Sequence, residues 1–146
     1  MREILFRGKR ADTGDWVKGF YVQKPNQFSE DGKPIRHCIV DLPPFGYDIN
    51  PETVGQFTGL LDKNGARIFE GDIIRTSKYG KVRNDNNSNG EDTFCVVYRP
   101  AQFRLEREKP PRGFNLVDDG FSKMEVIGNI HDNPELLEGG GEDADK

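Results

Sequence analysis

An Asn-Gly pair at positions 64 and 65 is the feature that most constrains the fold of this 146-residue chain. It separates two apolar segments, Phe57–Leu61 and Ile68–Phe69. Asn-Gly is the strongest short-range signal for a β-hairpin, because both residues tolerate positive φ. Just past this hairpin, Gly71 precedes a second apolar pair, which is typical of a kink or bulge that redirects a strand around a small barrel.

The register of this hairpin has two alternatives. A type I′ turn centred on Asn64 and Gly65 would place Leu61 opposite Ile68. A type I turn over Lys63 and Asn64, with Gly65 as a bulge, would shift the register by one residue.

Short apolar runs separated by turn signals continue along the rest of the chain, which predicts a mainly β protein with long loops and at most short helical turns. One such turn is expected where Asn133 precedes Pro134, because asparagine caps helix starts and proline suits the first helical position. The other predicted strands are Glu3–Phe6, Trp16–Val22, Ile35–Val40, Thr93–Arg99, Gln102–Glu106, Phe114–Leu116 and Met124–Ile127.

The strand predicted over Trp16–Val22 has apolar residues on both faces. At a period of two, Trp16, Phe20 and Val22 share one face, and we expect that face in the core. The neighbouring basic residues favour solvated faces and edges over a binding patch. These residues are Arg2, Arg7, Lys9, Arg10 and Lys18.

Length and composition predict one domain over residues 1–137, followed by an acidic flexible tail over 138–146. The formal net charge of -4 argues against a general nucleic-acid binder. Because the tail holds much of the excess negative charge, the body of the chain is close to neutral and this argument is weakened.

No secretory or targeting segment is recognisable near the start, and the longest apolar run, Phe94–Tyr98, is far too short to span a membrane. We therefore expect a cytoplasmic protein without membrane contact. In that compartment Cys38 and Cys95 would stay reduced and act as small buried residues.

Cations alternate with aromatic residues over one predicted hairpin. Such a pattern can follow a phosphate backbone and stack bases, although the nearby prolines and acidic residues also suit an ordinary exposed hairpin. The candidate nucleic-acid-binding residues are Arg99, Phe103, Arg104, Arg107, Lys109 and Arg112.

Metal and catalytic signals are weak. Asp85–Val96 begins like a calcium loop, but its twelfth position is valine instead of the required glutamate. We therefore predict no metal site, no cofactor and no catalytic residue. An enzyme with a carboxylate or histidine site is retained as an alternative, which would need a pocket where Asp72, His131 or Asp132 converge.

Three segments of this chain resemble the YopX family, whose members are encoded mainly by phages and prophages. The segments are MREILFRGKR with DTGDWVKG, then TVGQFTGLLDKNGARIFEGDII, then MEVIGNIHDNPELL. The resemblance implies a mostly β protein with an SH3-like barrel, and it implies no enzyme activity. It assigns no functional residues. The polar residues beside apolar strands in these segments are the better candidates for a site, although hydrogen bonding to buried loop groups explains them as well; they are Gln56, Thr58, Asn129 and Asp132.

The leading functional hypothesis is a non-enzymatic accessory module that binds a host or phage protein in the bacterial cytoplasm. The alternative is a nucleic-acid-binding protein that uses the basic hairpin. Neither the identity of the partner nor the oligomeric state follows from the sequence.

Overall fold

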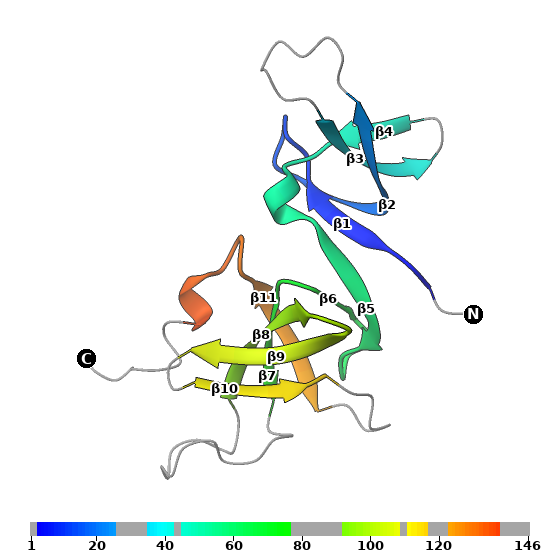
Figure 1. Ribbon diagram of the computed structural model, residues 1–146. Helices are drawn as coiled ribbons and strands as arrows, with labels where there is room; N and C mark the ends of the chain where they lie inside the picture. The colour runs from blue at the N-terminus through cyan, green and yellow to red at the C-terminus, as the bar shows by residue number, and fades with distance from the viewer. Residues whose placement is uncertain are drawn as a thin grey trace. The chain divides into compact units, whose positions relative to one another are not determined.

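The chain is mainly β. The computed structural model describes residues 3–25, 35–42, 45–76, 92–108, 111–116 and 123–137. Within these residues the strands form antiparallel sheets that do not close on themselves, so a closed SH3-like barrel is not observed (Figure 1). The chain divides into two compact units, an N-terminal unit of Met1–Phe57 and a C-terminal unit of Thr58–Lys146.

The N-terminal unit is built on a sheet with the strand order β4-β3-β2-β1, followed by the start of β5. A 3-10 helix over Pro51–Thr53 precedes β5, and the side chain of Asn50 caps it by accepting a bond from the N–H of Glu52. The strands are β1 (Phe6–Lys9), β2 (Trp16–Pro25), β3 (Ile35–Leu42), β4 (Phe45–Asp48) and β5 (Gly55–Leu61).

The core of this unit lies on the face opposite to the predicted one. Ile39 is fully buried and is registered against Tyr21, so the core side carries the odd-numbered residues of β2. Phe20, on the expected core face, is 60% exposed, and that prediction is wrong. The physical reason is the neighbouring strand: Arg7 and Lys9 of β1 share the face of Trp16, and charged side chains are seldom buried in a core.

The C-terminal unit pairs the second half of β5 with β6 (Arg67–Phe69) and adds a five-stranded sheet in the order β10-β9-β8-β7-β11. Its core contains the buried residues Ile68, Ile74, Phe94, Val96, Leu105 and Met124. Figure 1 shows β8, β9 and β10 running side by side. The five strands are β7 (Asp72–Thr76), β8 (Asp92–Arg99), β9 (Gln102–Glu108), β10 (Pro111–Asn115) and β11 (Met124–Asn129).

The hairpin between β5 and β6 has the bulged form. The N–H of Gly65 bonds to the carbonyl of Asp62 at 3.0 Å, so Lys63 and Asn64 are the central residues of the turn. Gly65 then takes the positive φ of 85°. The type I alternative is confirmed and the type I′ register is wrong.

Asp62 fastens this hairpin turn to the edge of β11. Its carboxylate accepts bonds from the backbone N–H groups of Asn64, Ala66 and Val126 at 2.8, 2.9 and 3.0 Å. The N–H of Lys63 also bonds to a carbonyl of β11, that of Met124, at 2.9 Å. Backbone groups on the outer edge of β11 are therefore paired with the turn.

Gly71 redirects the chain between β6 and β7, as the sequence predicted. It adopts a φ of 92°, and its N–H bonds to the carbonyl of Val96 at 2.8 Å. The carboxylate of Asp72 closes the same turn by accepting a bond from the N–H of Phe69 at 2.7 Å.

The expected helical turn near the C-terminus is present over residues 135–137. The backbone carbonyl of Asn133 accepts a bond from the N–H of Leu136. The side-chain oxygen of Asn133 instead accepts one from the N–H of Asn129. The acidic segment 138–146 lies outside the described residues, and the single domain over 1–137 stays a prediction. In the described part of the chain, no helix has the length and apolar character needed to cross a membrane.

Candidate functional site

The β8–β9 hairpin holds most of the residues predicted to bind nucleic acid, and it divides them between two faces. In an antiparallel pair, residues opposite each other share a face, and successive residues alternate. Arg99 is registered with Gln102 and therefore shares the outer face with Arg104. Phe103 and Arg107 point to the core side.

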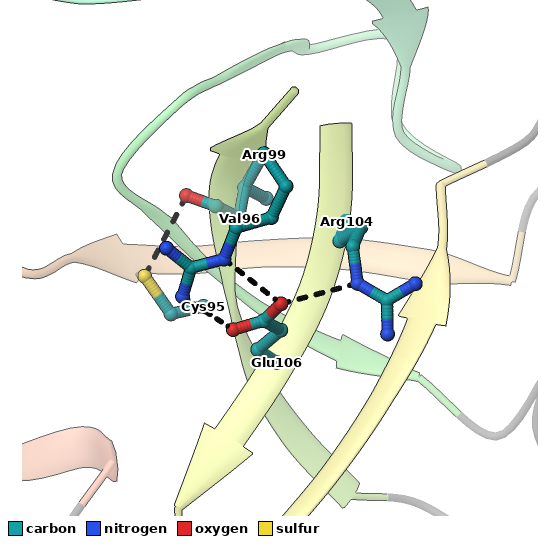
Figure 2. A network of polar contacts seen from close by, with 5 residues as sticks. All are labelled: Cys95, Val96, Arg99, Arg104 and Glu106. Atoms are coloured by element: carbon teal, nitrogen blue, oxygen red, sulfur yellow. Dashed lines mark hydrogen bonds and ion pairs between the residues drawn. The ribbon is translucent and has the colours of Figure 1, made fainter. Parts of the chain in front are cut away.

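Two arginines on the outer face bind one glutamate (Figure 2). Arg99 forms an ion pair with Glu106 at 2.7 Å, and the Nε of Arg104 donates to the same carboxylate at 3.1 Å. Arg104 also donates to the side-chain oxygen of Asn115 at 2.7 Å. Figure 2 shows the two arginines on either side of Glu106.

The pKa shifts in this network match its contacts. The hydrogen bond with Glu106 raises the pKa of Arg99. The bond from Arg99 lowers the pKa of Glu106, and the bond from Arg104 lowers it further, against the opposing effect of burial. Both partners are therefore held in their charged forms at neutral pH, and the carboxylate offsets one of the two positive charges.

The residues on the core side of this hairpin are occupied with packing. Phe103 lies against the hydrophobic core, and its ring meets that of Tyr98 edge-on at a centroid distance of 5.3 Å. The guanidinium of Arg107 lies 5.8 Å from the ring centroid of Phe94. Among its described residues, the hairpin therefore divides the predicted cations between its two faces.

Two further predicted residues follow the β9 strand. Arg112 is registered opposite Arg107 in β10. Its side chain and the whole of Lys109 lie outside the described part of the structure. Nucleic-acid binding by this hairpin stays a prediction.

The N-terminal sheet does place cations and aromatic rings together. On β2, Trp16, Lys18 and Phe20 alternate toward one face, and Lys9 and Arg7 of β1 are registered opposite Trp16 and Lys18. We call these five side chains the aromatic–cationic face. The guanidinium carbon of Arg7 lies 4.7 Å from the centroid of the Trp16 ring, and the Lys9 ammonium lies 5.4 Å from it.

Exposure distinguishes the two rings of this face. Trp16 is partly buried beneath its two cations, whereas Phe20 is 60% exposed. Cation–π contacts of this geometry hold a positive charge beside an aromatic surface. The face therefore brings together an exposed ring, a partly covered ring and three cations.

This face was not predicted from the sequence, because Trp16 and Phe20 were assigned to the core. It also ended the first strand at Phe6, whereas β1 runs over Phe6–Lys9. The signal that could have found the face is the alternation of Arg7 and Lys9 within that strand. Two cations at a period of two must lie on the same side of the hairpin.

A pocket of about 370 Å³ on the same unit is lined by Arg10, Ala11, Asp12, Gly46, Tyr47 and Asp48. Arg10 donates two bonds to Asp12 at 2.9 and 2.8 Å, and its guanidinium lies 4.5 Å from the Tyr47 ring centroid. Asp48 pairs with Arg36 at 2.6 Å. The charged groups that line this pocket are thus paired within the protein.

The residues named for the enzyme alternative form hydrogen bonds within turns of the chain. Asp72 closes the turn before β7, and Asp132 accepts a bond from the side chain of Asn129 at 3.2 Å. The backbone N–H of His131 donates to the Asn129 side chain at 3.0 Å. Among the described residues, no group of three histidine, cysteine or acidic side chains is arranged to hold a metal ion.

The two thiols are both buried. Burial raises the pKa of Cys95 to about 11, and the nearby carboxylates of Asp72 and Glu70 add to the shift. Burial also raises the pKa of Cys38, with a contribution from the bond to Asp48. A nucleophilic cysteine needs a lowered pKa, so neither thiol is suited to that role.

Comparison with known proteins identifies the family of this sequence. The family model described as YopX protein matches residues 5–138. The chain belongs to the YopX family. This match confirms the resemblance and extends it across nearly the whole chain.

A solved structure is similar to this YopX chain. The crystal structure of protein EF1440 from Enterococcus faecalis matches with a TM-score of 0.50 and 24% sequence identity. The alignment covers 94% of this chain and 99% of that one. At this level of identity the similarity concerns the fold. No curated protein matches the sequence.

Proposed function

We propose that this protein is a non-enzymatic accessory module of phage or prophage origin, which acts in the bacterial cytoplasm by binding an anionic partner. The observation that supports the proposal most strongly is the exposed Phe20 ring on a sheet face that also carries Trp16 and three cations. An exposed aromatic ring beside several cations is a common feature of binding surfaces.

The charges on this face support an anionic partner. Arg7, Lys9 and Lys18 lie on two neighbouring strands, so their positive fields add locally although the whole chain carries a net charge of -4. An acidic surface of a host or phage protein and a nucleic-acid backbone both meet this requirement.

The SH3-like barrel belongs to the same proposal and concerns the C-terminal unit. Leu60 of β5 and Ile68 of β6 pack into the core against the five-stranded sheet. The Asp62 turn also bonds to β11. This hairpin would supply the strands that a small barrel requires, and the fold similarity to EF1440 is compatible with either arrangement.

Retention on immobilised heparin tests whether the face binds a polyanion. We expect the protein to be retained at low salt, and the double variant Lys9→Gln with Lys18→Gln to elute at lower salt, because fewer counterions are exchanged on binding. Lys123→Gln removes one exposed lysine of the C-terminal unit and serves as the control. Failure of the wild-type protein to bind heparin at low salt would overturn the proposal, as would equal effects of the double variant and the control.

A further inference from the structure

We infer that the ligand of the aromatic–cationic face is a single-stranded nucleic acid, an inference that rests on the proposed function. A base would stack on the exposed Phe20 ring, beside the partly covered Trp16 ring, and phosphates would lie near Arg7, Lys9 and Lys18.

The spacing of the face supports a linear ligand. Trp16 and Phe20 are four residues apart on β2, which places them about 13 Å apart along the strand. Lys18 lies between them, and Arg7 and Lys9 form a second row on β1, about 4.8 Å to the side. A row of rings beside a row of cations matches a polymer that has flat groups along one edge and charges along the other.

The chemistry of the two rings favours a nucleic acid over an acidic protein surface. Carboxylates on a protein would pair with the cations but would leave the Phe20 ring in water. Each nucleotide of a single strand supplies both a phosphate and a base with an open π-face. In a duplex the bases are already stacked on one another, so a flat sheet face cannot use them.

The charge around the face also favours this ligand. Lys24, farther along β2, lies on the same side of the strand by alternation. The Asp48 carboxylate on that side of the sheet is paired with Arg36 at 2.6 Å. Four cations, Arg7, Lys9, Lys18 and Lys24, therefore lie on this side of the β1–β2 hairpin.

The sequence-predicted hairpin divides its described cations between two faces. Its described outer arginines, Arg99 and Arg104, share Glu106, and Phe103 packs against the core. The exposed ring of Tyr98, at 51%, is the feature that the hairpin has in common with the N-terminal face. Tyr98 therefore provides the matched comparison for Phe20.

The test is a titration of the full chain with single-stranded DNA and RNA of about 16 nucleotides, the upper range of sites for a small β fold. Trp16 is the one tryptophan in the sequence, so its fluorescence reports directly on the face. Labelled oligonucleotides give the affinity by anisotropy. We expect saturable quenching of Trp16, tighter binding of single strands than of a duplex of equal length, and weaker binding as salt rises.

Two substitutions locate the binding surface. Phe20→Ala should weaken single-strand binding about 5- to 100-fold, because one base–aromatic stack is lost. Tyr98→Ala should leave it unchanged. Circular dichroism and thermal unfolding of each variant check that the fold is intact. Loss of binding with Tyr98→Ala but not with Phe20→Ala would assign the ligand to the hairpin and overturn the inference.

The heparin experiment distinguishes failure of the single-strand inference from failure of the proposed function. Heparin binding that depends on Lys9 and Lys18, without preference for single strands and without an effect of Phe20→Ala, would overturn the nucleic-acid inference and leave the proposed function standing. Binding of neither heparin nor oligonucleotides would overturn both.

Discussion

The carboxylate of Asp62 accepts a 3.0 Å hydrogen bond from the backbone N–H of Val126, a residue 64 positions later in the chain. The same carboxylate holds two N–H groups of its own turn, those of Asn64 and Ala66. One buried side chain therefore organises the β5–β6 turn and also attaches it to the edge of β11.

Asp62→Ala should destabilise the C-terminal unit by about 3 kcal/mol, because it leaves three backbone donors without their acceptor. Asp62→Asn should cost less, since its amide oxygen can still accept. Urea unfolding followed by circular dichroism measures the free energy, and hydrogen exchange at the Val126 amide should accelerate. Asp12→Asn, at an exposed carboxylate, is the control. Equal stability of Asp62→Ala and wild type would show that this contact is not structural.

The stability due to Asp62 should depend on pH. Burial works to raise its pKa, but the bonds from Val126, Ala66 and Asn64 lower it below the ordinary value of 3.8. A lowered pKa in the folded state means that the stabilisation is complete above the unfolded pKa, near 4, and is lost as the pH falls through the folded value.

This pH dependence is measured as the difference in unfolding free energy between wild type and Asp62→Asn. We expect a constant difference from pH 7 to about pH 5 and a shrinking one below about pH 4. A difference that grows on acidification would contradict the direction of the pKa shift.

Gly19→Ala should destabilise the N-terminal sheet by about 2 kcal/mol, the usual effect of overpacking. A Cβ at position 19 would overlap the carbonyl oxygen of Val40 in the adjacent strand, and backbone cannot move aside easily. Thermal unfolding monitored by Trp16 fluorescence reports on this unit. Lys18→Ala, at the exposed neighbouring position, should shift the midpoint much less. Similar shifts for both variants would argue against this close contact.

Cys95 should react slowly with a thiol reagent such as DTNB in the native protein. Its side chain is buried and its pKa is raised to about 11, so roughly one molecule in a thousand carries the thiolate at pH 8. Cys38 is also buried with a raised pKa. Reaction in urea should be rapid for both. Fast modification of Cys95 in the folded state would indicate that β8 opens readily.

Glu106→Gln distinguishes the hairpin from the N-terminal face as a site for anions. The change removes the carboxylate that Arg99 and Arg104 share, and it makes the hairpin more positive. Binding of single-stranded oligonucleotides should stay the same if they occupy the N-terminal face. A clear increase in affinity at low salt would point to the hairpin instead.

Local turn chemistry predicted the parts of the fold that depend on neighbouring residues. The hairpin at Asn64 and Gly65 and the redirected strand at Gly71 follow from residues that favour those conformations. The choice between the two hairpin registers did not follow from the sequence. It depends on Asp62, whose carboxylate binds N–H groups in the turn and in the distant β11 strand.

The face of β2 that forms the core could not be assigned in the same way. Both faces carry large apolar residues, and the decision depends on β1 and β3, which pack against β2 from other parts of the chain. Strand β4 was not among the predicted strands, and Pro43 and Pro44, which favour loops, directly precede it. The sequence could have shown that the basic hairpin divides its residues between two faces. Phe103 and Arg104 are adjacent in one strand, and adjacent strand residues point to opposite faces.

Strand β5 contains the boundary between the two units, between Phe57 and Thr58. Gly55 and Gln56 pair with β1, and the hydroxyl of Thr58 donates to the carbonyl of Ile68 in β6. Recombination at this point would therefore divide a strand and leave an unpaired fragment on each product. The two units are compact, yet they meet within one strand and not at a linker where they could be exchanged as cassettes, so we expect related genes to inherit them together.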